Sequence, residues 1–332
     1  MMPHPRVKHW PSSWKLNAPL RHHHLVYKDA QMTQAPATLI QSQARTGIVL
    51  MIAAWGMFSV IDTSAKYLVL AAIPAVQVAF MRYAVQFLFT AIEGSLDGMR
   101  VIKSLDHTTL ALLTLRGALL VVSTFFNFVA VKYLSLTMTA AIMFSSPIFV
   151  ALFSILFLGE RVGIWRWSAI IIGFIGVLII VRPFNEDFHW AALLSLHNAI
   201  AIALFSMITR RLAGTVNAQV MQFFSGALGT IALCPFAIFA WQMPTQAVGW
   251  ALLFVVGVGA WLGHNMFSRA HVYANATTLM PFSYSFIIFM AVSSYLVFGT
   301  RPDGWVYVGA VLVAGSGLII WWREKQSSQQ ER

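Results

Sequence analysis

Residues 164–182 read IWRWSAIIIGFIGVLIIVR, a run of 19 residues with charged side chains only at its third and last positions. About 20 predominantly apolar residues are needed for an α-helix to cross a lipid bilayer. The chain contains nine further runs of similar character, at approximately 47–69, 75–94, 108–131, 135–157, 189–209, 218–240, 247–269, 276–298 and 304–322. Open strands cannot satisfy their backbone polar groups in lipid, and the runs lack the alternation of a barrel. The pattern therefore predicts an all-α integral membrane protein with ten transmembrane helices.

The composition of the 332 residues agrees with a membrane protein. Hydrophobic residues make up 58% of the chain, charged residues 10%, and the mean hydropathy is +0.72. A typical soluble protein has about 25% charged residues, so this chain lacks the polar surface of a soluble enzyme or a disordered chain. The single cysteine, Cys234, excludes a disulfide scaffold.

The net charge of +11 is explained by membrane topology. If the N-terminus is cytoplasmic, 16 of the 22 Lys and Arg residues lie inside, 3 lie outside and 3 lie within the predicted spans. The positive-inside rule then predicts that both termini are cytoplasmic. We expect a multi-pass protein of the bacterial inner (plasma) membrane, with lipid around it. The sequence has no basic face with interleaved aromatics, so no nucleic acid partner is expected.

The two ends of the chain are predicted to be cytoplasmic tails. Residues 1–45 lack the apolar segment of a cleavable signal peptide and are expected to be disordered. Their His22–His24 run is a solvated segment or a metal ligand, and translation starts at Met1 or at Met32. Residues 323–332 form the second tail. Nowhere does a His/Cys cluster have metal-ligand spacing, so neither a metal nor a cofactor is expected.

An internal repeat divides the predicted spans into two halves of five, over residues 46–183 and 184–322. A shift of 140 residues aligns 110–180 with 250–320 without a gap, with 19 identities over 71 positions. The pattern Gly-x-Arg-x-x-x-Trp at 159–165 recurs at 299–305. Because five is odd, the second half must enter the membrane upside down. Inverted repeats of this kind are an architecture of secondary transporters, which work by alternating access.

Several motifs of the first half lie in a recognisable order. They are Lys66 at the end of span one, Arg82 in span two, Arg116-Gly117 in span three, Ser146-Pro147 in span four, and Leu158-Gly159-Glu160-Arg161 before span five. With these motifs, residues 47–322 resemble the drug/metabolite transporter superfamily and, within it, the EamA-type ten-helix transporters. The second half departs from the pattern, because Thr300 replaces the usual acid after Gly299.

The resemblance implies transport rather than catalysis. Members of that family move amino acids, sugars, nucleosides, vitamins and S-adenosylmethionine, some inward and some outward. The sequence around 116–183 and the ending 321–324 resemble bacterial members linked to riboflavin or S-adenosylmethionine uptake. Riboflavin or a similar planar heterocycle is therefore the lead substrate. The alternatives are S-adenosylmethionine uptake and export of amino acids or other metabolites.

Other features bear on the mechanism of transport. The chain has no phosphate-loop motif, so ATP does not drive transport through this chain alone, and a proton or another ion is a possible coupling partner. The sequence is also compatible with a homodimer. The rival of another class is an integral membrane enzyme, but the short loops carry no catalytic spacing.

Charged residues within the apolar runs are candidate transport residues, because such groups are costly in lipid. Asp62 is the only carboxylate well inside a predicted span, and Lys66 lies four residues further on the same helix face. Asp62 is interpreted as a substrate anchor, a proton-responsive group or half of a structural ion pair; Lys66 is its partner or snorkels outward. Arg82 is expected to hold an anionic substrate group or to pair with Asp62. Arg116 is expected to snorkel.

Amides, imidazoles and helix breaks complete the candidate set. His-Asn pairs in spans six and eight can relay protons, read the edge of a heterocycle, or form interhelical bonds. Prolines 147 and 281 predict broken helices that line a cavity or pack as kinks. Trp55, Phe126, Tyr284 and Trp261 either stack on a planar substrate or pack. The predicted substrate and transport residues are Asp62, Lys66, Arg82, Ser145, Ser146, His197, Asn198, His264, Asn265, Tyr284 and Ser285.

Overall fold

The computed structural model describes residues 37–103, 105–146, 148–150, 152–153, 164–182, 188–212, 215–274 and 279–330. The chain divides into two compact units, 1–44 and 45–332, and the packing that follows is that of the second unit. The tail predicted before residue 37, with its histidine run and Met32, lies outside the described residues.

The described part of the chain consists of helices joined by turns and loops and contains no strand, which confirms the predicted all-α class. Its α-helices are α2 (Ala37–Leu70), α3 (Ala75–Lys103), α4 (His107–Tyr133), α5 (Leu136–Met143), α7 (Ile164–Val181), α8 (Ala191–Leu212), α9 (Ala218–Phe239), α10 (Ala247–Tyr273), α12 (Ser285–Phe298) and α13 (Gly304–Gln330). A 3₁₀ turn, η2 (Met280–Tyr284), precedes α12. Several helices extend beyond the predicted spans, and α3 and α13 continue furthest past the predicted ends, to Lys103 and Gln330.

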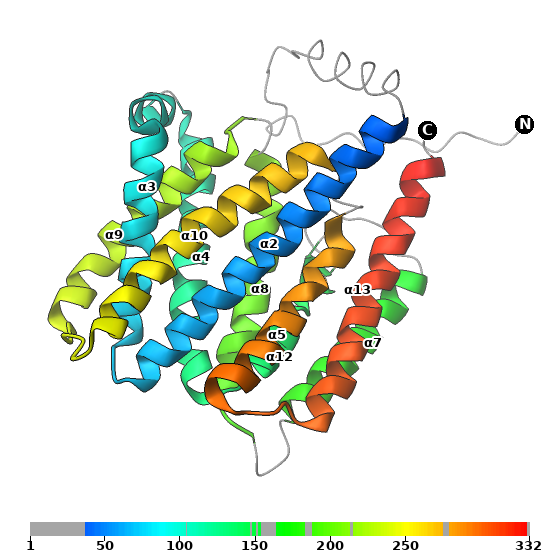
Figure 1. Cartoon of the computed structure of the whole chain (residues 1–332). Coiled ribbons are helices and arrows are strands. Elements are labelled where there is room, and N and C mark those ends of the chain that lie inside the picture. The colour runs from blue at the N-terminus through cyan, green and yellow to red at the C-terminus, as the bar shows by residue number, and fades with distance from the viewer. Residues whose placement is uncertain are drawn as a thin grey trace, which may run out of the picture. The chain divides into compact units, whose positions relative to one another are not determined.

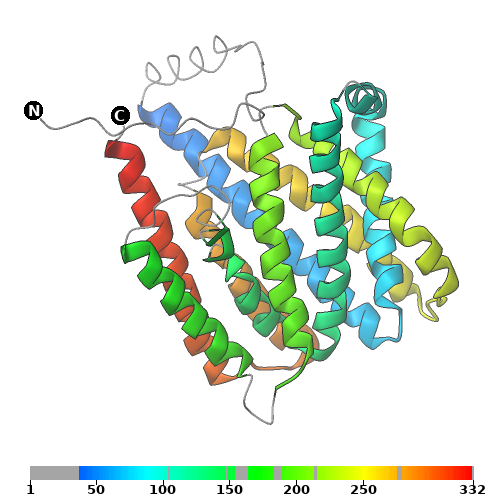
Figure 2. The same ribbon diagram turned by 180° about the vertical axis from the view of Figure 1, so that it is seen from behind.

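Within the described ranges, α2, α3, α4, α8, α9 and α10 are long and apolar enough to cross a membrane. The apolar stretches of α5, α7, α12 and α13 are shorter. Within the second unit, the N-terminal part of α2 and the C-terminal part of α13 lie at the same end of the bundle, as an even number of crossings requires (Figure 1). The two views in Figures 1 and 2 show the helices running side by side, with α7 next to α13.

Helices that correspond in the two halves pack against each other. The second spans pair as α3 with α9, the fourth as α5 with α12, and the fifth as α7 with α13. The α3–α10 and α4–α9 contacts are also equivalent, since each joins the second span of one half to the third of the other. This pairing is what a twofold axis between two inverted repeats produces.

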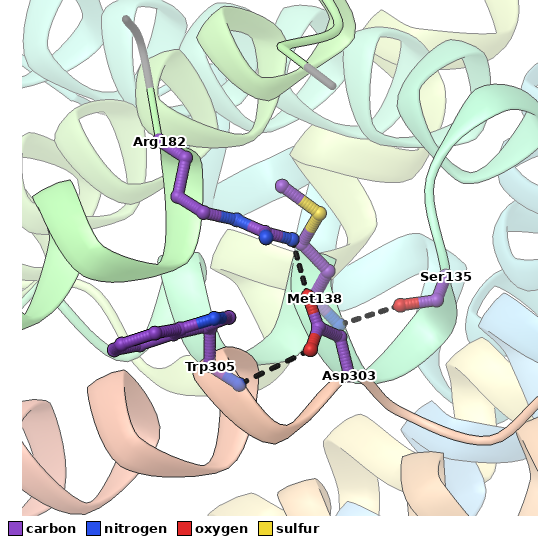
Figure 3. A network of polar contacts seen from close by, with 5 residues as sticks. All are labelled: Ser135, Met138, Arg182, Asp303 and Trp305. Atoms are coloured by element: carbon purple, nitrogen blue, oxygen red, sulfur yellow. Dashed lines mark hydrogen bonds and ion pairs between the residues drawn. The ribbon is translucent and has the colours of Figure 1, made fainter. Parts of the chain in front are cut away.

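The α7–α13 pair is close because glycines face each other. A Cβ atom added to Gly176 would lie 2.9 Å from the carbonyl oxygen of Gly309, and one added to Gly309 would lie 2.6 Å from that of Gly176. Small residues let packed membrane helices approach in this way. Arg182, at the end of α7, forms an ion pair with Asp303, which also accepts a hydrogen bond from the backbone N–H of Trp305 at the start of α13 (Figure 3).

Both predicted helix breaks are present, in spans four and nine. The helix α5 ends at Met143, and Ser145 lies in a turn before helical structure resumes; Pro147 itself lies outside the described residues. In span nine the 3₁₀ turn η2 leads into α12 at Ser285. Ser145 Oγ donates to the carbonyl of Ile142 at 2.6 Å, and Ser285 Oγ donates to that of Phe282 at 2.7 Å. Residues 145 and 285 are equivalent under the 140-residue shift, so the repeat extends to this local bond.

Candidate transport site

The side chain of Asp62 is joined to a chain of hydrogen bonds across three helices. Its Oδ1 accepts a hydrogen bond from Nδ2 of Asn127 on α4 at 3.0 Å. Asn127 Oδ1 in turn accepts from Nδ2 of Asn198 on α8 at 3.4 Å, and Asn198 Oδ1 accepts from the hydroxyl of Ser123. Asp62 is half-buried, whereas Asn198 and Ser123 are buried. These hydrogen bonds therefore link the carboxylate of Asp62, in the first half, to α8 of the second half.

A second polar cluster joins α3 to α10. Nη2 of the buried Arg82 lies 3.4 Å from Nε2 of His264, and the guanidinium lies 4.6 Å from the ring centre of Tyr83. The Tyr83 hydroxyl hydrogen-bonds to Thr124 on α4 at 2.9 Å. Nη1 of Arg82 is buried and has no hydrogen-bond partner within the described residues. A buried N–H without a partner is costly, so it is a natural position for an acceptor on a ligand.

Neither cation predicted to pair with Asp62 forms an ion pair with it within the described residues. Lys66 Nζ donates instead to the carbonyl of Leu134 at 2.5 Å and lies 5.4 Å from the ring centre of Phe298. The carbonyl is at the C-terminal cap of α4, where the helix dipole favours a cation. Lys66 is buried, so it does not snorkel. Arg82 bonds to His264 as described above.

The prediction that Arg116 snorkels is wrong. Its side chain is 6% exposed and is bonded inside the bundle. Nε donates to the hydroxyl of Thr209 at 2.8 Å, and Nη1 donates to the hydroxyl of Ser225 at 2.9 Å and to the carbonyl of Met221 at 3.2 Å. Its guanidinium also lies 4.3 Å from the ring centre of Phe205. Three fixed acceptors on α8 and α9 favour a structural role for this residue.

Aromatic rings gather beside the two helix breaks. The indole of Trp55 lies 5.9 Å from the ring of Phe144 at the first break and 5.3 Å from that of Phe286 in α12. Its Nε1 is buried and has no hydrogen-bond partner among the described residues. Tyr284 lies 5.1 Å from Phe144, while Ser146 is half-buried where the first break ends. Aromatic rings thus lie around both breaks, together with the indole N–H of Trp55, which has no partner among the described residues.

The remaining imidazole of the predicted set, His197, belongs to neither polar cluster. Its ring lies 5.0 Å from the ring of Phe126 in an edge-to-face arrangement. Nδ1 of His197 is buried and makes no hydrogen bond within the described residues. Its neighbour in sequence, Asn198, is the member of this pair that enters the Asp62 chain.

A separate cavity of about 460 Å³ lies between α3, α9 and α10. Its lining is Glu93, Ala218, Gln219, Gln222, Asn265, Ser268 and Arg269. The structure thus places Asn265 on the cavity wall, one residue from the His264–Arg82 contact. Glu93 Oε2 accepts a hydrogen bond from the indole N–H of Trp261 at 3.1 Å, which fixes the carboxylate on one wall.

The sequence reasoning missed several residues of these clusters. Asn127 and Ser123 are single polar residues within an apolar run, and their spacing of four positions places them on one face of α4. That spacing is a signal that a search for isolated polar pairs would have found. Gln86 on α3 and Gln222 on α9, whose amides hydrogen-bond to each other, were also missed. Within the described residues, no group of three His, Cys, Asp or Glu side chains is arranged to hold a metal ion.

Comparison with known proteins places this geometry in context. The sequence pattern of the EamA-like transporter family matches residues 45–182 and again 189–322. A riboflavin transporter of Vibrio cholerae is 29% identical over 288 residues, which cover 86% of this chain and 96% of the relative. An S-adenosylmethionine uptake transporter of Rickettsia bellii is 30% identical over 196 residues, covering 59% of this chain and 67% of the relative. A protein crystal structure with 16% identity has a similar fold, with a TM-score of 0.58 over 84% of this chain and 96% of that one.

Proposed function

The chain belongs to the EamA-like transporter family, and from this premise we propose that it is a secondary active transporter of a small organic metabolite. It works by alternating access in the bacterial inner membrane, with both termini in the cytoplasm. The lead substrate is riboflavin or a similar planar heterocycle. The observation that carries the proposal is the hydrogen-bond chain from Asp62 through Asn127 to Asn198, which connects the two inverted halves.

In this proposal Asp62 is the group that couples transport to protons. A carboxylate deep in a membrane span is costly unless it is neutralised or bonded, so adding a proton changes what it can bind. Protonation turns one acceptor oxygen into a donor, while the Asn127 amide can offer either function by rotating. The rearranged bonds reach Asn198 on the second half and thereby bias one arrangement of the halves over the other.

Arg82, His264 and the rings around Trp55 hold the substrate. The unpartnered Nη1 of Arg82 and Nε1 of Trp55 are donors that a heterocycle with carbonyl or ring-nitrogen acceptors satisfies. Trp55 also offers a ring for stacking, as in pockets that combine apolar walls with a few polar groups. The similarity to a riboflavin transporter over nearly its full length supports this substrate class.

Uptake of S-adenosylmethionine is the second candidate. Asp62 and Arg82 carry opposite charges and form no ion pair with each other within the described residues, so each remains available to an oppositely charged ligand group. A ligand with both an ammonium and a carboxylate group suits that pair. The similarity to an S-adenosylmethionine uptake transporter also favours it, over the part of the chain that matches.

Transport into proteoliposomes with labelled riboflavin or labelled S-adenosylmethionine tests both candidates. We expect saturable uptake of one substrate that increases when a proton gradient is applied. Asp62→Asn should abolish the effect of the gradient but leave exchange of labelled for unlabelled substrate. Arg82→Ala should weaken apparent affinity by about tenfold or more, the effect of losing a hydrogen bond to a charged donor.

The matched controls are Asp106→Asn and Arg301→Ala, which make the same kinds of change outside the membrane-spanning helices. Both should transport as the wild-type protein does. No saturable flux of either substrate would refute the proposed substrates. Unchanged flux in both Asp62→Asn and Arg82→Ala would refute the site.

A further inference from the structure

Gln222, on the wall of the cavity between α3, α9 and α10, is hydrogen-bonded to Gln86, and no feature of the transport site uses this pair of amides. Gln86 on α3 is 1% exposed, and its Nε2 donates to Oε1 of Gln222 on α9 at 3.2 Å. Gln222 is half-buried and lies on the cavity wall. This single bond uses one donor and one acceptor, which leaves one amide group of each residue for another partner.

The groups that remain are an acceptor and a donor. Oε1 of Gln86 is buried and has no hydrogen-bond partner in the described part of the chain. Nε2 of Gln222 likewise makes no bond to the described residues. If both amides are turned over, the bond between them reverses, and the remaining groups are again one donor and one acceptor. A ligand must therefore offer one donor and one acceptor to this pair, whichever way the amides are oriented.

A buried amide oxygen without a partner is unfavourable unless something else supplies a donor. A planar heterocycle with an N–H next to a carbonyl or ring nitrogen supplies both groups along one edge. The imide of a flavin and the amino edge of an adenine share this arrangement, and paired hydrogen bonds from a Gln side chain read such an edge in other contexts. The cavity, at about 460 Å³, is within the usual size of small-molecule sites.

The position of the pair connects the cavity to the transport site. Residues 82, 86 and 93 fall within about 40° of one another around α3, at 100° per residue. Arg82 and Gln86 thus share a face with Glu93, which lines the cavity. On α10, Asn265 lines the cavity and follows His264, which contacts Arg82. A ligand at the amide pair therefore lies on the same helix faces that lead to Arg82.

We propose that Gln86 and Gln222 form a binding site for the donor–acceptor edge of a planar heterocycle. The site lies next to the cavity, on the helix faces that lead to Arg82. The inference rests on the proposed function in that it assigns part of the substrate's recognition. It adds a specificity site to that function: the pair selects heterocycles with an unblocked N–H beside an acceptor. By the positive-inside rule, this end of the bundle faces the cytoplasm.

Equilibrium binding to the purified full-length protein in lipid nanodiscs tests the proposal, with two matched ligand pairs. The pairs are riboflavin with its N3-methyl derivative, and adenosine with its N6,N6-dimethyl derivative. For at least one pair, we expect the wild-type protein to bind the unblocked member about tenfold more tightly, because the methylated ligand leaves a buried amide unpaired. Which pair is discriminated identifies the ligand class.

Variants locate the discrimination. Gln86→Leu should bring the affinity ratio to about one, because it removes the buried acceptor that only the unblocked ligand satisfies. Gln222→Leu removes the donor that both members of each pair use, so it should weaken the binding of both members, and a thermal melting measurement establishes that each variant is folded. The control is Gln242→Leu. Gln242 is exposed, and its hydrogen bonds to Gln77 are made by its backbone, so the variant should keep the wild-type affinity ratio.

The outcomes separate this inference from the proposed function. Equal affinities for both members of both pairs in the wild-type protein would overturn the amide site. A folded Gln86→Leu variant that still discriminates as the wild type does would overturn it as well. If proton-driven flux is absent but binding discriminates within a pair and depends on Gln86, the result would instead count against the proposed transport mechanism and leave the site standing.

Discussion

Asn127 is the residue on which the connection between the two halves depends, because it bonds to Asp62 on one side and Asn198 on the other. Replacing it by leucine removes both bonds and leaves buried polar groups unpaired, at a cost of about 1–3 kcal/mol for each. We expect Asn127→Leu to lower the melting temperature and to reduce gradient-driven transport more than exchange. Asn127→Ser should retain part of the thermal stability and part of the gradient-driven transport.

The measurement for Asn127 is a comparison of gradient-driven uptake with exchange in the same proteoliposomes, alongside thermal melting in detergent. Thr230→Val is a suitable control, because the Thr230 hydroxyl bonds only to its own helix, at the carbonyl of Gly226. If Asn127→Leu melts and transports like the wild-type protein, the hydrogen-bond chain has no part in transport.

Asp106 caps α4 and gives a pH dependence of stability that is independent of transport. Hydrogen bonds from the Thr109 side chain and from the backbone N–H groups of Thr109 and Thr108 hold the pKa of Asp106 below its ordinary value. A depressed pKa means that the cap stabilises the fold fully above the unfolded pKa of about 4 and loses this effect as the pH falls through the folded pKa.

Asp106→Ala should therefore lower the melting temperature at pH 7, and the difference from the wild-type protein should shrink as the pH approaches 3. Asp106→Asn keeps a capping oxygen without the titrating charge, so it should melt close to the wild type and lose the pH-dependent part. Thermal melting across this pH range checks both. A difference for Asp106→Ala that stays constant with pH would contradict the titration.

At the scale of the residue, the sequence located the candidate positions better than their partners. Asp62, Arg82 and Asn198 lie in the two polar clusters because a polar group inside an apolar run must be bonded. Their partners come from helices far away in the sequence, so spacing along one helix gave the wrong partner for Lys66 and the wrong environment for Arg116. The cost of burying those cations is offset by a helix C-terminal carbonyl and by three acceptors, respectively.

The α7–α13 pair is the element in which close packing is most easily tested. A methyl group on Gly309 would lie 2.4 Å from Cγ1 of Ile180 as well as against the Gly176 carbonyl, whereas one on Gly315 of the same helix would meet nothing within 4 Å. We expect Gly309→Ala to destabilise the protein by about 1–3 kcal/mol through overpacking. Gly315→Ala should be neutral or stabilising, because alanine favours a helix over glycine.

Thermal melting of the two glycine variants in one detergent is the measurement, and the contrast between them is the result. Both substitutions add the same atom to the same helix, so helix propensity cannot explain a difference in sign. Equal melting temperatures for the two variants would show that α7 and α13 do not pack through these glycines.

The helix breaks show how far a sequence pattern leads at the scale of the element. Proline predicts a break because it removes a backbone donor, and both spans four and nine are broken. The ends of the elements were less predictable: α3 and α13 continue past the apolar runs, because a helix is not required to stop where its side chains become polar. The serine bonds at the breaks, Ser145 to Ile142 and Ser285 to Phe282, depend on local backbone geometry that composition does not specify.

For the whole molecule, the predicted orientation can be tested with single cysteines. In a Cys234→Ala background, Gln242→Cys lies between α9 and α10 and Thr215→Cys lies between α8 and α9. If the N-terminus is cytoplasmic, a membrane-impermeant thiol reagent added to intact cells should label the first and not the second. Lysed cells provide the control, since both cysteines should then react. Labelling of Thr215→Cys alone would reverse the orientation, and labelling of both would contradict the arrangement of spans.

The architecture of the whole molecule was predictable because the repeat constrains it. Five spans in each half require inversion, and the pairing of α3 with α9, α5 with α12 and α7 with α13 follows from the resulting twofold relation. The cavity was not predictable, because its lining comes from three helices of which each contributes only a few polar residues to an otherwise apolar run.

The pairing of α7 with α13 also has a consequence for how the protein is made. The helix α7 ends at Val181 and its partner begins only at Gly304, so about 120 residues must be synthesised between them. At 5–20 residues per second, the glycine-bearing face of α7 waits roughly 6–25 seconds for its partner after it has left the ribosome. During that interval the first half is a membrane-inserted intermediate with an uncovered close-packing surface. Until α13 covers it, this face of α7 is accessible to insertion factors and membrane proteases, and the C-terminal helix completes the assembly.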